Sequence, residues 1–189
     1  MKMDSKRDLP KRKPTRLKNF DYSSAGAYFV TICIRDRMHL LSEIVGEGLA
    51  PPEQNSANQT VGEGLAPPEI TVKLKPCGEV VKEQLQLVEA RFPSVTIEDY
   101  VIMPDHIHAV IFLHEKAGGA SPSPTLDDVV CAFKSLTSRS CKQKFGIEKM
   151  FQRSSAEHIV RDRDDYETRR KYIYENPMRW YYKHLKTEE

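Results

Sequence analysis

The stretch VTIEDYVIMPDHIHAVIFL occupies residues 95–113 and contains two strand-like segments on either side of a turn signal. Residues 95–103 alternate well enough between apolar and polar side chains to predict a β-strand. Pro104 and Asp105 are typical turn residues, and residues 106–113 are dense in the branched and aromatic side chains that favour strands. We therefore expect two consecutive strands here, and the rest of the chain has to supply their neighbours.

The segments on the N-terminal side add further strands to this pair. Residues 28–34 (YFVTICI) are apolar on both faces, which predicts a central strand. Residues 40–45 and 70–74 suit a pair of strands. Together with three predicted helices, this order gives an α+β domain in which helices pack on an antiparallel sheet.

The three helices are predicted from apolar spacing and capping residues. Residues 79–92 carry apolar side chains at the 4-3-4 spacing of an amphipathic helix. Thr125 can cap a second helix, and Asp162 or Asp164 can cap a third. Pro177 should end or kink the third helix, because proline disfavours the helical conformation of the residue before it.

Two segments stand outside the regular elements of this domain, which we place at residues 20–185. Residues 1–19 are polar, basic and proline-containing, which predicts a flexible basic arm. The sequence VGEGLAPPE occupies residues 45–53 and returns unchanged at 61–69. Its glycines, prolines and small side chains cannot form a core face, so residues 46–68 are predicted to be an inserted loop.

Composition limits the class of protein. The 189 residues include 39% hydrophobic and 30% charged residues, which is typical of one globular domain. No apolar run approaches the ~20 residues that span a bilayer, and the start lacks the apolar region of a signal peptide, so we expect a cytoplasmic protein. The four cysteines have no metal-binding spacing and are expected to be reduced packing residues.

The net charge of +2 hides two basic clusters. One lies in residues 2–18 and the other in residues 161–183. Phosphate backbones attract such clusters through the release of counterions, which would suit a nucleic-acid partner. An equally consistent interpretation is a solvated tail and an ordinary charged helix face.

The sharpest chemical feature is the pair His106 and His108. Residues two apart in a strand point to the same face, so two imidazoles can reach one divalent cation. A dinuclear hydrolase of the barrel type also uses a His-x-His pair, but that fold needs about 250 residues and this chain is too short. The alternative is that one or both histidines simply form hydrogen bonds near a sheet edge.

Tyr172 and Asn176 lie four residues apart in the last predicted helix and therefore share a helix face. The carbonyl oxygen of Asn176 suits Mg²⁺ or Mn²⁺, and a tyrosine can act as a covalent nucleophile. Tyr174 is about 200° around the helix from Tyr172 and should face away. Tyr172 could instead be a packing residue, like most of the eight tyrosines.

Several segments occur together in a characteristic order. They are YSSAGAYFVTICIRDR (22–37), EDYVIMPDHIHAVI (98–111), AFKSLTSR (132–139), FQRSSAEHIVRDRDDYETRR (151–170) and KYIYENP (171–177). This set resembles the REP-associated tyrosine transposases, relatives of the single-tyrosine insertion-sequence transposases of the HUH superfamily. The likeness covers roughly residues 16–182 apart from the repeat-bearing insertion, which has no counterpart in the family pattern. MPDHIH and YIYENP at this separation are its most specific part.

The resemblance implies a ferredoxin-like antiparallel sheet with helices packed on it and with the histidines on a central strand. It implies that His106 and His108 bind a divalent metal, Mg²⁺ or Mn²⁺, together with Asn176, and that Tyr172 is the nucleophile. The implied reaction is the cleavage and joining of single-stranded DNA at hairpin-forming repeats. It proceeds through a 5′-phosphotyrosine intermediate and needs no ATP.

The partner implied by the resemblance is single-stranded or hairpin DNA, bound by a monomer or a homodimer. Charge and placement predict phosphate contacts for seven basic residues: Arg12, Lys13, Arg16, Lys134, Arg153, Arg161 and Arg170. Two other interpretations stay open, a domesticated non-catalytic protein that binds DNA hairpins and a metal-dependent hydrolase that activates water. The hydrolase would not need Tyr172. The presence of both histidines, Tyr172 and Asn176 argues against the non-catalytic alternative.

Overall fold

The computed structural model describes residues 22, 24–47, 69–115 and 124–185. Its main sheet has four antiparallel strands in the order β4-β5-β1-β6. The strands are β1 (Gly26–Cys33), β4 (Val95–Ile102), β5 (His106–Leu113) and β6 (Ala156–Val160). β5 and β1 are the two inner strands, which confirms the predicted α+β sheet and the central position of the segment 28–34.

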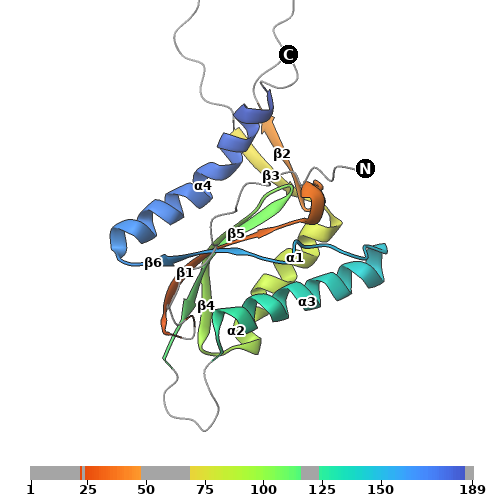
Figure 1. Ribbon diagram of the computed structural model, residues 1–189. Helices are drawn as coiled ribbons and strands as arrows, with labels where there is room; N and C mark the ends of the chain where they lie inside the picture. The colour runs from red at the N-terminus through yellow and green to blue at the C-terminus, as the bar shows by residue number, and fades with distance from the viewer. Residues whose placement is uncertain (1–21, 23, 48–68, 116–123, 186–189) are drawn as a thin grey trace, which may run out of the picture.

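Helices cover both faces of the sheet (Figure 1). On one face lie α1 (Pro76–Gln86), α2 (Val88–Arg91) and α3 (Leu126–Phe145), and on the other lies α4 (Arg163–Leu185). Because the inner strand β5 is covered on both sides, seven of its eight residues are buried.

Side-chain alternation along β1 and β5 divides the interior into two cores. The larger core lies on the side of α1, α2 and α3 and includes Val30 and Ile32 of β1. The smaller core lies beneath α4 and is formed by Phe29, Val110 and Ile173. The site described below belongs to the face that carries the smaller core.

A separate two-stranded sheet is formed by β2 (Ser42–Glu47) and β3 (Glu69–Leu74), which pair antiparallel as predicted. It lies beside the C-terminal part of α4 (Figure 1). Gly46 packs so closely against Tyr181 that an added Cβ would lie 2.5 Å from the ring. The insertion predicted at residues 46–68 therefore begins two residues later, because Gly46 and Glu47 belong to β2. Residues 48–68 lie outside the described part of the chain.

The predicted helix starts are partly confirmed. Thr125 caps α3 and forms a capping box with Asp128. At the start of α4, Asp162 accepts a hydrogen bond of 2.8 Å from the backbone N–H of Asp165. The helix expected over 79–92 instead begins at Pro76 and is interrupted at Leu87, between α1 and α2. Proline suits the first turn of a helix, where its missing N–H would have had no helical partner.

The structure of the C-terminal third differs from the sequence analysis in two places. Residues 156–160 form the strand β6, which the sequence pattern did not predict. Pro177 lies inside α4, and the helix continues to Leu185, so the expectation that Pro177 ends the helix is wrong, while the expected kink stays a prediction. Proline removes one helical hydrogen bond, but α4 is held on both sides of it, because Ile173 is buried against the sheet and Tyr181 packs on Gly46.

The four cysteines are free, and Cys77 and Cys141 are buried as expected of packing residues. Cys131 is exposed on α3, so that expectation is wrong for this position. No helix among the described residues is both long and apolar enough to cross a membrane.

Candidate active site

His106 and His108 are the first and third residues of β5 and lie on the face of the sheet that α4 covers. Their ring centroids are 4.6 Å apart, and both side chains are buried. The prediction that the two imidazoles share a face is confirmed. β5 lies between β4 and β1, so the histidines are not on an edge strand, although both form the hydrogen-bond contacts that the alternative interpretation named.

Each imidazole is oriented by a partner on its Nδ1 atom. The carboxylate of Asp105 accepts a hydrogen bond from Nδ1 of His106, since a carboxylate can only accept. Nδ1 of His108 lies 2.9 Å from the hydroxyl of Thr31, its cross-strand neighbour on β1. Both contacts leave the Nε2 atoms as the available ligand atoms, which is the arrangement that supports metal-binding histidines.

The electrostatics of the pair favour a neutral His108. Burial, followed by the nearby charges of His106 and Arg37, lowers the pKa of His108 to about 3. Burial alone would raise the pKa of Asp105, but hydrogen bonds from His106 and Arg37 outweigh it and lower that pKa. His108 is therefore uncharged at neutral pH, and a neutral imidazole is the form that binds metals.

Tyr172 and Asn176 approach this pair from α4. The Tyr172 ring lies 5.1 Å from that of His108, centroid to centroid, and is 36% exposed. Asn176 is only 6% exposed. Tyr172, Asn176 and His106 line one cavity of about 510 Å³. The shared helix face that the four-residue spacing predicted thus faces the histidines.

Tyr174 turns away from the cavity, as its position around the helix predicted. Its hydroxyl donates a hydrogen bond of 2.9 Å to Asp99 on β4, and the Tyr166 hydroxyl is shared between Asp99 at 3.0 Å and Glu98 at 2.7 Å. The adjacent register shift in β4 is a β-bulge or similar irregularity. Asp99 therefore ties α4 to β4 through two tyrosines.

The side chains in the cavity suit a divalent cation. Among the described residues no group of three or more His, Cys, Asp or Glu is arranged for a metal, so an all-acidic or thiolate site is absent there. Two imidazoles and one amide oxygen could still hold a cation such as Mg²⁺ or Mn²⁺. The Asn176 side chain, although 94% buried, forms no hydrogen bond within the described ranges, which leaves its amide oxygen available.

The cavity contains residues that the sequence reasoning did not select as site residues. They are Arg37, His39, Asp105, Arg179, Trp180, Lys183 and His184. The spacing in α4 contained the signal, because positions 172, 176, 180 and 184 follow one another at four-residue steps. Continuing the face of Tyr172 and Asn176 would have led to Trp180 and His184.

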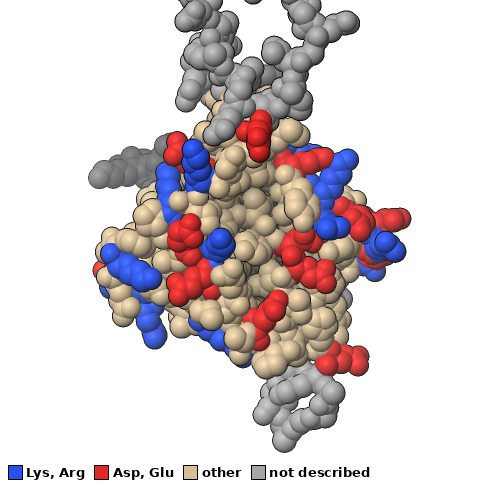
Figure 2. All heavy atoms as spheres, turned by 180° about the vertical axis from the view of Figure 1, so that it is seen from behind, with Lys and Arg blue, Asp and Glu red and all other residues tan. Residues whose placement is uncertain are grey.

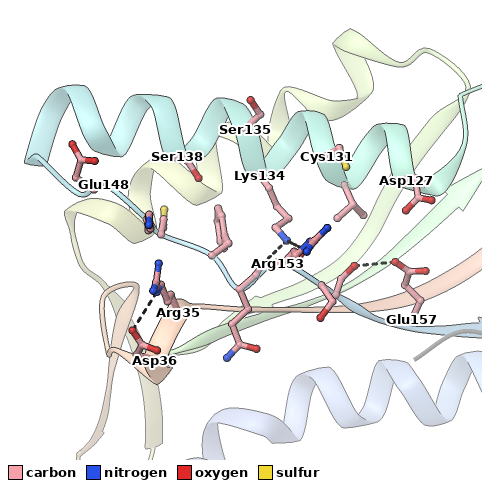
Figure 3. Close-up of a pocket in the computed structure, with 17 residues that line it drawn as sticks. Arg35, Asp36, Asp127, Cys131, Lys134, Ser135, Ser138, Glu148, Arg153 and Glu157 are labelled. Atoms are coloured by element: carbon pink, nitrogen blue, oxygen red, sulfur yellow. Dashed lines mark hydrogen bonds and ion pairs between the residues drawn. The ribbon is translucent and has the colours of Figure 1, made fainter. Parts of the chain in front are cut away.

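The four predicted phosphate contacts that lie in the described part of the chain do not line this cavity. Arg12, Lys13 and Arg16 lie outside the described residues. Lys134 and Arg153 line a second cavity of about 1030 Å³ between α3 and the segment before β6 (Figure 3). The Nζ atom of Lys134 donates hydrogen bonds to the carbonyls of Gln152 and Arg153, so this lysine is already engaged.

The two remaining candidates lie on or next to α4. Arg161 is exposed just before the helix. Arg170 forms an ion pair of 3.6 Å with Asp99 and lies over the Tyr174 ring. On the face shown in Figure 2, basic and acidic side chains are interspersed. Charge on that face therefore does not by itself mark a surface for DNA.

Comparisons with known proteins agree with this geometry at the level of the fold. No family model matches the chain. The structure of a REP-associated tyrosine transposase bound to a REP hairpin is similar, with a TM-score of 0.53 and 18% identity over 82% of this chain and 68% of that one. This chain has a transposase-like fold. The ferredoxin-like prediction, with helices packed on an antiparallel sheet, is confirmed by this likeness.

Two further matches are weaker or less informative. A candidate transposase from Deinococcus radiodurans has a TM-score of 0.44 and 15% identity, over 86% of this chain and 96% of that one. An uncharacterized protein of Haemophilus influenzae is 27% identical over 184 residues, which cover 89% of each chain.

Proposed function

We propose that this protein is a metal-dependent single-tyrosine transposase that cleaves and rejoins single-stranded DNA at hairpin-forming repeats. The observation that carries the proposal is the placement of Tyr172 and Asn176, on one face of α4, against the paired imidazoles of β5. The resemblance of MPDHIH and YIYENP to the REP-associated tyrosine transposases supports it, as does the likeness to a transposase solved with a REP hairpin.

In the proposed reaction Tyr172 is the nucleophile. Its hydroxyl oxygen forms a bond to the phosphorus, and the bond from that phosphorus to the 3′-oxygen breaks. The phenol loses its proton and the leaving oxygen gains one, so the products are a 5′-phosphotyrosine and a free 3′-hydroxyl. The phosphodiester energy stays in the new link, so rejoining is the reverse attack by a 3′-hydroxyl and needs no ATP.

The remaining residues of the site would hold the metal ion and orient its ligands. His106, His108 and Asn176 would hold a divalent cation, Mg²⁺ or Mn²⁺, which when bound polarises the scissile phosphate. Asp105 and Thr31 keep the two imidazoles in place through their Nδ1 atoms. Since Tyr172 lies next to the histidines of its own chain, the proposal does not require a second copy for catalysis.

The experiment that tests the proposal looks for a covalent adduct. The protein is incubated with labelled single-stranded hairpin DNA and Mn²⁺ or Mg²⁺ and then run on a denaturing gel. We expect an adduct with the wild-type chain and none with Tyr172→Phe, which should still bind DNA because phosphate contacts dominate affinity. Tyr174→Phe is the matched control and should still form the adduct.

The same experiment separates the alternatives. DNA binding without any adduct or cleavage would favour the non-catalytic hairpin-binding protein. Metal-dependent cleavage that survives Tyr172→Phe would favour a hydrolase that activates water. An adduct that requires Tyr174 instead of Tyr172 would contradict the proposed nucleophile.

A further inference from the structure

The cavity that holds Tyr172 and Asn176 extends beyond them towards the C-terminal end of α4. Its outer part is lined by Trp180 and His184 from the helix and by Arg37 and His39 from the segment that follows β1. The whole space measures about 510 Å³, within the roughly 300–1,000 Å³ that small-molecule sites occupy. His106, Tyr172 and Asn176 take up only one part of this lining, so the outer part needs a separate explanation.

One side of the outer part is aromatic. The Trp180 ring is stacked on His184, with centroids 4.2 Å apart and an interplanar angle of 19°. His39 meets Trp180 edge to face at 5.3 Å. Trp180 also lies 5.9 Å from His106, so the aromatic side adjoins the proposed metal ligands directly. Such rings offer planar surfaces on which a base can stack.

The other side of the outer part is cationic. Arg37 and Arg179 are both more than half exposed. Their ion-pair partners, Asp105 and Glu175, each engage only part of a guanidinium that carries five N–H donors, and Arg179 also lies over the Tyr172 ring. Asp105 is the one acidic residue in the described lining. It is also held by His106 and Arg37, so it offers little opposition to an anion.

A planar aromatic side next to two arginines matches a nucleotide better than it matches either of its parts. A free phosphate would use the arginines alone, and an apolar ligand would use the rings alone. We infer that the outer part of this cavity binds one nucleotide of the substrate strand next to the scissile phosphate. Its base packs against Trp180 and its phosphate contacts Arg37 and Arg179. This inference rests on the proposed function.

The chain offers a direct probe, because Trp180 is its one tryptophan. The wild-type chain is titrated, in EDTA, with a hairpin that carries a single-stranded flank, and tryptophan fluorescence is recorded while anisotropy of labelled DNA reports binding. We expect saturable quenching by the intact flank. Removing the base at one flanking position should weaken or abolish the quenching, while inorganic phosphate alone should produce none.

Two results would overturn the inference. One is binding of the intact flank, seen by anisotropy, without any change in Trp180 fluorescence. The other is equal quenching by a fully abasic flank or by inorganic phosphate, since either would mark a site for anions only. The wild-type titration needs no variant, so it stands even if a substitution impairs folding.

Variants then separate stacking from general packing. Trp180→Leu should raise the DNA concentration for half-maximal adduct formation about tenfold, the scale of one stacked base. Trp180→Phe should restore most of the loss, because it keeps an aromatic surface. Tyr182→Leu is the matched control, since Tyr182 is an exposed aromatic residue of the same helix outside the cavity lining. If Tyr182→Leu raised the DNA concentration for half-maximal adduct formation as much as Trp180→Leu does, the inference would be contradicted.

Failure of the inference and failure of the proposed function are distinguishable. If Tyr172→Phe still forms the adduct while the flank quenches Trp180, the nucleophile is wrong and the nucleotide site stands. If the adduct requires Tyr172 but the flank leaves Trp180 unaffected, only the nucleotide site is wrong.

Discussion

The two faces of the four-stranded sheet are built from the same inner strands but differ in their side chains and in the helices that cover them. On the side of α1 and α3, β5 presents Ile107, Ala109 and Ile111 to an apolar core. On the side of α4, it presents His106 and His108, followed by Val110. One hydrogen-bonded ladder thus supports a packed core and a polar site at alternate positions.

The comparison shows what a buried polar site requires. A polar group removed from water needs hydrogen-bond partners. In the described part of the chain no fully buried side-chain nitrogen or oxygen lacks one. On the polar face Asp105 and Thr31 satisfy the two Nδ1 atoms of the histidines, while the Nε2 atoms are left as candidate ligands. The apolar face requires only close packing of its side chains. Substitutions on the two faces should therefore have different effects.

The largest effect on activity is expected at His108. His108→Ala should reduce metal-dependent adduct formation by more than the roughly 100-fold that loss of an outer-shell partner causes, because it removes one of the proposed metal ligands. The free energy of unfolding, measured by urea denaturation, should change far less than activity. Wild-type adduct formation by this variant would show that His108 is not part of the site.

The neighbouring residue on the other face should show the reverse. Ile107 is fully buried, so Ile107→Ala should lower the free energy of unfolding by about 2–5 kcal/mol. Below its melting temperature the variant should keep adduct formation within about tenfold of wild type, because no reacting group is lost. A larger loss of activity in Ile107→Ala than in His108→Ala would contradict the assignment of the core to one face and the active site to the other.

The polar face should also make stability depend on pH. Burial lowers the pKa of His108 to about 3, against about 6.5 for an exposed histidine, so the unfolded chain binds a proton as pH falls below 6.5 and the folded chain does not. The resulting stability is present above pH 6.5 and is lost progressively towards pH 3. Between pH 6.5 and 5 this amounts to about 2 kcal/mol.

Urea unfolding in metal-free buffer across that range measures this dependence. His108→Gln should remove about 2 kcal/mol of the pH-dependent change. His114→Gln, at an exposed histidine that directly follows β5, is the control for the replacement of a histidine by glutamine. Equal slopes in wild type and His108→Gln would contradict a buried neutral imidazole.

A smaller effect is expected where α4 is tied to the sheet. Asp99 accepts hydrogen bonds from Tyr166 and Tyr174 and is 8% exposed, so Asp99→Asn should lower the free energy of unfolding by about 1–2 kcal/mol. Adduct formation should fall a fewfold, because α4 also positions Tyr172. Glu115→Gln, at an exposed carboxylate that follows β5, is the control and should change stability by less than about 0.5 kcal/mol.

Equal effects of the two substitutions would show that Asp99 has no special role in holding α4. A loss of stability in Asp99→Asn without any change in adduct formation would separate the anchor from the position of Tyr172. Tyr174→Phe, which removes one of the two hydrogen bonds, provides the intermediate case.

Sequence reasoning succeeded where a local period decides the structure. The strand period placed His106 and His108 on one face, and the helix period placed Tyr172 and Asn176 on another. It failed for β6, whose five residues form an edge strand and take their register from β1. A short edge strand carries little pattern of its own.

Sequence reasoning also failed where contacts between residues distant in sequence decide the structure. The continuation of α4 through Pro177 depends on packing at Ile173 and Tyr181, which no local rule contains. The charge of Lys134 and Arg170 was visible in the sequence, but their engagement by backbone carbonyls and by Asp99 was not. A charged side chain indicates a binding partner only where the fold does not already engage it in an internal hydrogen bond or ion pair.

The smallest effect is expected in the repeat-bearing insertion, which connects β2 to β3 in the sequence. Deleting residues 45–60 joins Ile44 to Val61-Gly62-Glu63, which has the same sequence as the segment it replaces in β2. The connection between β2 and β3 then shortens by 16 residues, from 21 to 5. Because each doubling of a loop costs about 0.6 kcal/mol, the deletion should leave stability unchanged or raise it by about 1 kcal/mol.

The matched control is deletion of 46–68, which also removes the residues that pair with Ile70 and Glu69 and the glycine that packs under Tyr181. Only this larger deletion should destabilise the β2–β3 hairpin and the adjoining end of α4. Thermal unfolding and adduct formation are measured for both. Collapse of stability in the 45–60 deletion would show that the repeat is part of the fold. Equal behaviour of the two deletions would show that Gly46 does not support α4.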